Sequence, residues 1–227
     1  MEKTKPSYDP YSSFLSLFSK FYAGILKGEF RRSFYLSYYY IYLKLRDLRY
    51  GVNFSHSHAP YEMSTISGAE ANGTGNFPAN PRIIRKIFKQ IAPYIDFDAP
   101  ICDIGCGSGI VLHVLSALGY RNLTGIEYAI QPFNQAVSNL SPSDIRLLNI
   151  DAFDHVFSDY KVLLFFSPFR DELALNFFKS FDLCQEFIVT VNHSPCIEAV
   201  LFRSHDIIYS FNHPIYDNFN GKIWRLR

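Results

Sequence analysis

What this sequence lacks excludes several classes of protein. Only four of its 227 residues are cysteines, Cys102, Cys106, Cys184 and Cys196, and no two of them form a C-x-x-C pair. Because they lie in or beside apolar runs, we expect reduced, buried thiols and no disulfide framework. No apolar run approaches the roughly 18 residues of a membrane-spanning helix, and the first residues lead into no secretory signal. A cytoplasmic location is therefore expected.

An excess of charge of either sign is also absent. The chain has 22 Lys and Arg residues against 21 Asp and Glu residues, so we expect no nucleic-acid partner. The charges are unevenly placed, because residues 1–50 hold nine basic residues and four acidic ones. The solvated faces of helices explain such an excess most simply, and contact with a membrane surface is a secondary alternative.

Two amphipathic helices are predicted in residues 1–50, where apolar side chains recur at helical spacing. These are Phe14, Phe18, Phe21, Tyr22, Ile25, Phe30, Phe34, Tyr38, Ile41, Tyr42, Leu45 and Leu48. Packing onto the parent domain is favoured over contact with lipid or with a partner. Residues 51–79 show no periodicity and are predicted to form a loop over the active site. His56 and His58 in this loop lack companion ligands, so no metal site is expected.

Residues 80–227 alternate between strand and helix patterns. Asn80-Pro81 is a helix cap followed by proline at the first helical position, which predicts a helix over 81–92. Strands are predicted at 100–105, 122–127, 145–150, 161–167, 186–192, 206–211 and 222–226, and further helices at 109–118, 132–139, 172–181 and 195–202. This alternation predicts a doubly wound α/β fold with a mostly parallel seven-stranded sheet. The last two strands have no helix between them and should form an antiparallel hairpin.

A glycine-rich turn follows the first of these strands. In the segment I-C-D-I-G-C-G-S-G, residues 101–109, three glycines alternate with other residues before a helical pattern begins. The backbone must turn tightly there and admit a ligand closely. A nicotinamide-binding loop would place its third glycine at position 110, where this chain has isoleucine, so the spacing speaks against NAD.

The segment resembles motif I, D-x-G-x-G-x-G, of the class I S-adenosylmethionine-dependent methyltransferases, whose sheet also ends in a hairpin. The resemblance implies S-adenosylmethionine as the cofactor, with its methionine end held by Asp103 and the backbone of Gly105 and Gly107. Cys106 and Gly109 belong to the same loop and are included among the cofactor-binding residues.

Acidic residues at the ends of the next two strands extend the resemblance. Glu127 is implied to accept the ribose hydroxyls, with Tyr128 near the adenine edge. Asp151 is implied to accept from the adenine amino group and Ala152 to supply a backbone N–H, although Asp154 is an alternative to Asp151. Upstream, Phe77 and Asn80 lie where relatives close a segment over the cofactor carboxylate. Asn80 is equally suited to a helix cap alone.

The fourth strand ends in Ser167-Pro168-Phe169, the position of motif IV beside the departing methyl group. Amine-methylating relatives often carry Asp, Asn or Ser, two prolines and an aromatic residue there. This chain has one proline fewer and resembles the N-P-F variant of poorly characterised bacterial methyltransferases, while a plain strand-end turn is the alternative. His193, after the fifth strand, is a candidate base because an imidazole has an ordinary pKa near 6.5.

These observations predict a methyltransferase with helices in residues 1–50, a loop or lid in 51–79 and a methyltransferase domain in 80–227. We expect the acceptor to be a small molecule or a glycan precursor, with a protein side chain as the alternative. A non-catalytic interaction module on the same fold is the alternative of another class.

Overall fold

The computed structural model describes residues 21–22, 24–28, 30–58, 63–65, 76, 78–141, 143–181, 183–193, 195–212 and 220–227. Phe14 and Phe18 of the predicted helical stripe, and Phe77 of the predicted cofactor site, lie outside the described residues. None of the helices in the described part of the chain combines the length and the apolar character that spanning a bilayer requires.

The domain is built around a seven-stranded sheet with the strand order β3-β2-β1-β4-β5-β7-β6. Its strands are β1 (Ile101–Ile104), β2 (Leu123–Ile126), β3 (Arg146–Leu148), β4 (Val162–Phe166), β5 (Phe187–Val191), β6 (His205–Asn212) and β7 (Asn220–Leu226). The first five are parallel to one another, whereas β7 is antiparallel to both β5 and β6. The predicted doubly wound fold and its antiparallel C-terminal hairpin are therefore confirmed.

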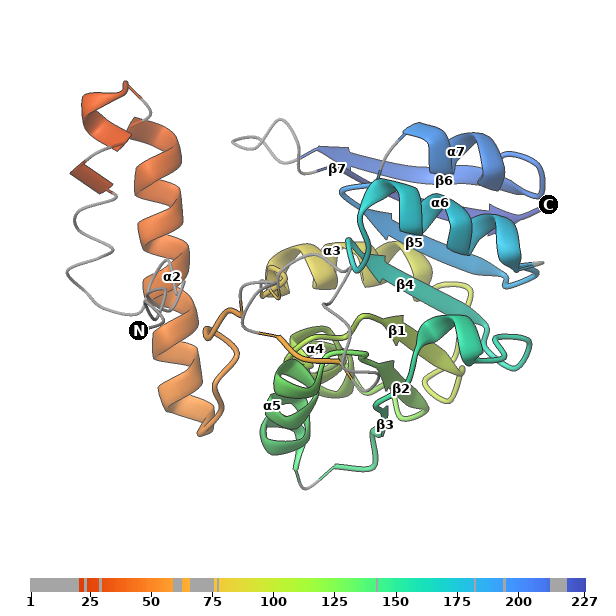
Figure 1. Ribbon diagram of the computed structural model, residues 1–227, viewed down its shortest axis with the longest axis horizontal. Helices are drawn as coiled ribbons and strands as arrows, with labels where there is room; N and C mark the ends of the chain where they lie inside the picture. Colours follow the sequence, from red (N-terminus) through yellow and green to blue (C-terminus); the bar gives the residue numbers. More distant parts are fainter. Residues whose placement is uncertain are drawn as a thin grey trace, which may run out of the picture.

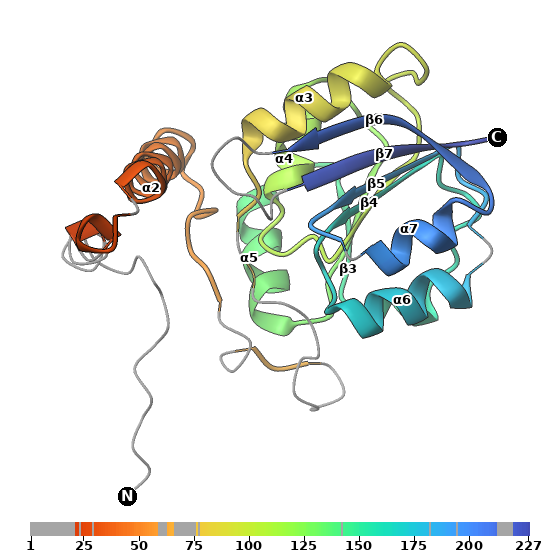
Figure 2. The ribbon, with the colours of Figure 1, turned by 90° about the horizontal axis from the view of Figure 1, so that it is seen from above.

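Helices cover both faces of this sheet (Figures 1 and 2). One face carries α3 (Pro81–Ile91) and α4 (Ile110–Ala117), with α5 (Ile130–Leu140) beside β3, and the other carries α6 (Asp171–Ser180) and α7 (Pro195–Leu201). Side chains of β4 alternate between the two cores: Val162 and Leu164 pack into the first, Leu163 and Phe165 into the second. This alternation is the period-two pattern of a strand covered on both faces.

The four cysteines differ in their burial. Cys102 and Cys106 are buried, but Cys184 and Cys196 are exposed, so the expectation of four buried cysteines was wrong for the latter two. In α7 the buried positions are Ile197 and Leu201, one helical turn apart, which turns Cys196 away from the core. Cys184 precedes β5 in a loop, where no strand pairing draws it inward.

Helix α2 (Phe30–Tyr50) packs one face onto the domain. Leu43 is buried in the first core, the Tyr39 hydroxyl donates to the Pro78 carbonyl at 3.2 Å, and Asp47 accepts from the Ser55 N–H at 2.7 Å. On its other face the large side chains of Phe34, Ile41, Leu45 and Leu48 stay exposed, whereas the partly exposed Tyr38 accepts from Arg82 of α3 at 3.0 Å. The favoured expectation of packing onto the domain thus describes one side of this helix only.

Candidate active site

The sheet changes direction at β1 and β4, and the predicted site residues gather there. The chain passes from β1 outward to β2 and β3, then returns to β4 on the other side of β1. The helices after β1 and β4 therefore lie on opposite faces, leaving a crevice outside the carboxyl ends of these strands. In Figure 1 the arrowheads of β4 and β5 point to the side of the molecule on which α2 lies.

The glycine-rich turn between β1 and α4 adopts a conformation that its sequence requires. Gly105, Gly107 and Gly109 have φ values of 70°, 55° and 85°, in the left-handed region that glycine reaches without steric cost. A Cβ atom at Gly105 would overlap the ring of Pro168, and one at Gly107 would overlap the side chain of Asn76. The turn is thus in contact with motif IV on one side and with residue 76 of the predicted lid on the other.

Asp103, the first residue of the motif, is a buried acid. Its side chain is 1% exposed, and neither carboxylate oxygen has a hydrogen-bond partner among the described residues. Burial, followed by the nearby Glu127 carboxylate, raises the pKa of Asp103 well above its ordinary value. A buried, unsatisfied carboxylate is costly in an isolated protein, and its cost would fall if a cationic ligand group bound beside it.

Glu127 ties the end of β2 to the glycine turn. Its two oxygens accept from the backbone N–H groups of Gly107 and Ala129, both at 2.9 Å. Burial raises the pKa of Glu127, and the hydrogen bonds from Ala129 and Gly107 oppose that shift. A carboxylate has about four lone-pair positions, so both oxygens keep capacity for further donors. The sequence predicted Glu127 at the site, but it did not predict the hydrogen bond from the Gly107 N–H to this carboxylate.

The end of β3 supplies the next part of the site. Asn149, which no sequence motif indicated, donates to the carbonyls of Glu127 at 2.7 Å and Tyr128 at 3.3 Å. Asp151 caps the short 3-10 helix η2 (Ala152–Asp154) by accepting from the Phe153 N–H at 3.0 Å, and Ala152 is buried. Asp151 and Ala152 come after β3, which pairs with β2, the strand that Glu127 follows. This is the position that the sequence predicted.

Parts of the 51–79 segment contact the same edge. The Ser64 carbonyl accepts from the Ile130 N–H at 2.9 Å, just after Glu127, and Ser64 also bonds the side chain of Gln131. Asn139 of α5 accepts from the Asn53 N–H at 2.7 Å and donates to the Ser108 carbonyl at 3.0 Å. These contacts attach the described pieces of the segment to the glycine turn and to the start of α5.

Asn80 has a different environment from the one its motif position implied. Its Oδ1 accepts from the Arg82 N–H at 2.9 Å and caps α3, while its Nδ2 donates to the Tyr35 hydroxyl at 2.8 Å. Both ends of this amide are thus engaged within the protein. The geometry matches the helix-cap alternative.

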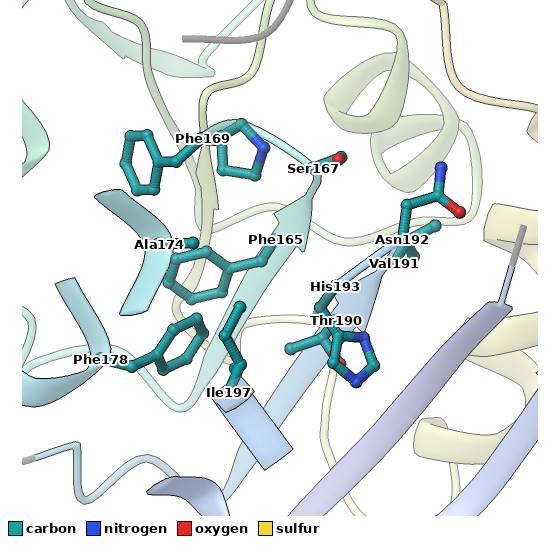
Figure 3. Close-up of a pocket in the computed structure, with 11 residues that line it drawn as sticks. Phe165, Ser167, Phe169, Ala174, Phe178, Thr190, Val191, Asn192, His193 and Ile197 are labelled. Atoms are coloured by element: carbon teal, nitrogen blue, oxygen red, sulfur yellow. The ribbon is translucent and has the colours of Figure 1, made fainter. Parts of the chain in front are cut away.

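A small pocket opens between the carboxyl ends of β4 and β5 (Figure 3). Its walls include Phe165, Phe178 and Ile197, and its rim carries motif IV. Figure 3 shows the polar ends of Ser167 and Asn192 extending beyond the tips of the two strands. Both residues have positive φ, 58° and 54°, which is uncommon for residues other than glycine. Ser167 was expected here from its motif, whereas no motif indicated Asn192.

His193 also lines this pocket, and its ring is in contact with Glu198. Its side chain is 4% exposed, its Nε2 lies 3.1 Å from Glu198 Oε1, and Glu198 pairs with Lys222 at 2.5 Å. Burial lowers the pKa of His193, and the Glu198 carboxylate opposes that shift. One ring nitrogen of His193 is thus engaged by Glu198, and the other, Nδ1, is buried.

The residues along this edge fit a cationic nucleoside such as S-adenosylmethionine. The unpartnered Asp103 carboxylate suits an ammonium or sulfonium group, and Glu127 keeps acceptor capacity for hydroxyl donors. The glycines of the turn allow Pro168 and Asn76 to approach its backbone closely, because Cβ atoms at Gly105 and Gly107 would overlap them.

Comparison with known proteins gives matches in sequence and in structure, although no family model matches the chain. Over 96 residues it is 30% identical to human EEF1A lysine methyltransferase 2, covering 40% of this chain and 41% of that protein. The mouse protein of the same name is 27% identical over 100 residues, again covering 41% of its length. The match thus spans less than half the length of these relatives.

Solved structures show the same fold. A ribosomal protein L11 methylase from Lactobacillus delbrueckii subsp. bulgaricus superposes with a TM-score of 0.52 at 16% identity, covering 65% of this chain and 80% of that one. An RNA methyltransferase from Salinibacter ruber, in complex with S-adenosyl-L-homocysteine, superposes with a TM-score of 0.50 at 14% identity, covering 66% and 93%.

The sequence matches also correct one expectation. We expected a small-molecule or glycan acceptor, and that preference was wrong, because the curated relatives are named as lysine methyltransferases of a protein. The prediction of the fold is confirmed, and one of the solved structures with this fold contains S-adenosyl-L-homocysteine. The chain has the class I methyltransferase fold.

Proposed function

We propose that this chain is an S-adenosylmethionine-dependent methyltransferase that methylates a lysine side chain of a protein. The observation that carries the proposal is the buried Asp103, without a partner among the described residues, before a glycine turn that touches Pro168 of the pocket between β4 and β5. The similarity to lysine methyltransferases over the matched region supports a protein amine as the acceptor. When bound, the cofactor supplies a methyl group that is activated by its attachment to a sulfonium sulfur, and the neutral thioether formed on transfer is a good leaving group.

The protein's share of the work is binding, alignment and exclusion of water. We assign the methionine end to Asp103 and to the backbone of Gly105, Cys106, Gly107 and Gly109. Glu127 is assigned to the ribose hydroxyls, and Tyr128, Asp151 and Ala152 to the adenine. Asn149 and Asn139 have positioning roles, because they hold the carbonyls of Glu127 and Ser108.

The pocket between β4 and β5 is assigned to the acceptor amine. Ser167 and Pro168 supply oxygen acceptors, and the aromatic rings of Phe165, Phe169 and Phe178 give the pocket an apolar wall. Apolar surroundings disfavour the ammonium form of a lysine and so favour the neutral, nucleophilic amine. His193 lines the same pocket and burial lowers its pKa, which favours the neutral imidazole and keeps His193 as a candidate proton acceptor.

The test is methyl transfer from tritiated S-adenosylmethionine to a size-fractionated cell extract. We expect label in protein that acid hydrolysis recovers as methyl-lysine. The matched control is Asp103→Asn, which keeps the side-chain shape but removes the carboxylate and should abolish the label. Calorimetry with S-adenosylhomocysteine should give binding to the wild type and much weaker binding to the variant.

Two outcomes would refute the proposal. Label confined to small molecules would exclude a protein acceptor. No heat with S-adenosylhomocysteine would leave a methyltransferase fold that does not bind the cofactor, which is the non-catalytic alternative.

A further inference from the structure

Two strained residues lie side by side at the acceptor end of the site. Among the described residues, Ser167 and Asn192 alone have positive φ without being glycine. Each directly follows its strand, and the last residues of those strands, Phe166 and Val191, are paired in register. Neighbouring parallel strands are about 4.8 Å apart, so the two strained residues are close neighbours.

Asn192 is held in this conformation by the strand on its other side. Its backbone N–H donates to the Asn220 carbonyl at 2.8 Å, at the start of β7. A non-glycine residue in the left-handed region costs roughly 1 kcal/mol or more, and such strain persists mainly where the surrounding structure imposes it and often at functional sites. Asparagine is one of the few residues that tolerate this region.

The side chain of Asn192 also contains an unsatisfied acceptor. Within the part of the chain that the structure describes, its Oδ1 is buried without a hydrogen-bond partner, and so is Oδ1 of neighbouring Asn220. Asn192 lines the pocket between β4 and β5, and its amide extends beyond the strand tip beside Ser167 (Figure 3). A buried acceptor without a donor costs about 1–3 kcal/mol, and a ligand with N–H groups would remove that cost.

We propose that Asn192 is an acceptor-binding residue whose side-chain oxygen receives a hydrogen bond from the methyl-accepting amine. This proposal rests on the proposed function. Motif IV places the amine site at the end of β4 alone, and Asn192 extends that site to the end of β5. With Ser167 on β4 and Asn192 on β5, the amine is held between two strand tips. A hydroxyl acceptor, with a single hydrogen to donate, would satisfy at most one of the two positions, so Asn192 selects for nitrogen.

The test uses sinefungin, a cofactor analogue in which a carbon-bound primary amine replaces the methyl-bearing sulfonium. Its amine occupies the place of the transferred methyl and reports on nearby acceptors without knowledge of the acceptor protein. Calorimetry would compare sinefungin with S-adenosylhomocysteine in wild type, Asn192→Gly and Asn192→Asp. Glycine removes the oxygen and the strain together, whereas aspartate keeps an oxygen in the same place and tolerates the left-handed region.

We expect Asn192→Gly to bind S-adenosylhomocysteine as the wild type does but to bind sinefungin about tenfold more weakly, the effect of losing one hydrogen bond to a charged group. Asn192→Asp should bind sinefungin at least as tightly as the wild type. The glycine variant should also melt at a higher temperature, because the strain is released.

An unchanged ratio of the two affinities in Asn192→Gly would overturn the proposal, as would an aspartate variant that loses sinefungin like the glycine variant. Equal loss of both ligands in both variants would also overturn it, because Asn192 would then serve the cofactor and not the amine. A wild type that binds neither ligand refutes the proposed function itself, and the two failures are therefore distinguishable.

Discussion

At the scale of single residues, the site depends on a buried acid that the fold leaves without a partner. Asp103 lies below the glycine turn with Glu127 nearby, and burial raises the pKa values of both carboxyl groups. Asp103 has no compensating donor, whereas Glu127 has two backbone N–H groups. The stability of the free protein should therefore depend on pH through Asp103.

Because its folded-state pKa is raised above the unfolded value near 4, the contribution of Asp103 is fully present below that value. It is lost as pH rises through the folded-state pKa. Relative to Asp103→Asn, the wild type should thus become less stable as pH increases above about 4. Urea unfolding of both proteins at several pH values would measure this difference, and parallel pH profiles would contradict it.

The glycine turn gives a second prediction at this scale. Gly105→Ala places a methyl group against Pro168 in a left-handed conformation, so both a clash and a backbone cost are expected. Gly51→Ala is the matched control, because Gly51 has a φ of 64° but no atom within 4 Å of the place that a Cβ would take. The control should lose roughly 1 kcal/mol of unfolding free energy. Gly105→Ala should lose more and should also fail to bind S-adenosylhomocysteine; equal losses would refute the contact.

At the scale of elements, α2 is an amphipathic helix whose exposed face carries large apolar side chains. Tyrosines and charged residues take part in its contacts with the domain, through Tyr35 to Asn80 and Asp47 to Ser55, while Phe34, Leu45 and Leu48 remain exposed. Hydrophobic periodicity alone would turn the exposed stripe inward. The opposite face instead packs Leu43 into the first core and forms hydrogen bonds with Pro78 and Asn80.

A pair of leucine substitutions tests this orientation. Leu43 is 2% exposed and Leu45 is 63% exposed. Leu43→Ala should therefore cost about 2–5 kcal/mol of unfolding free energy, whereas Leu45→Ala should cost almost none. Chemical denaturation of the two variants measures both values, and a larger loss for Leu45→Ala would show that the helix packs by its other face.

At the scale of the whole molecule, the C-terminal hairpin completes the sheet and contains a tryptophan that can report on folding. The single tryptophan, Trp224 in β7, is fully buried and donates to Thr190 of β5 at 2.9 Å. Its ring also contacts His193 and Phe202. Its fluorescence should therefore follow unfolding of the sheet as a unit.

Cofactor binding should stabilise this unit by mass action. S-adenosylhomocysteine at about 100 times its dissociation constant should add about 2.7 kcal/mol to the unfolding free energy. The same concentration should stabilise Asp103→Asn far less, because the carboxylate that suits the ligand's ammonium group is gone. Thermal unfolding followed through Trp224 measures both shifts, and equal shifts would remove Asp103 from the binding site.

Much of this fold was accessible from the sequence because its signals are local. Alternating apolar patterns placed all seven strands within a few residues, and the D-x-G-x-G-x-G segment identified the turn where only glycine fits. The missing helix before the last strand predicted the hairpin. Each of these features depends on residues that are neighbours in the chain.

The tertiary structure decided what depends on residues distant in sequence. Ser167 and Asn192 have positive φ directly after the paired strands β4 and β5, and no local pattern signals such a conformation in residues other than glycine. The grip of Glu127 on Gly107, the engagement of Asn80 by Tyr35 and the exposed stripe of α2 likewise depend on long-range contacts. The sequence by itself determined the elements and the glycine-rich turn, whereas packing determined the proposed acceptor site, because its residues come from strands that meet only in the folded sheet.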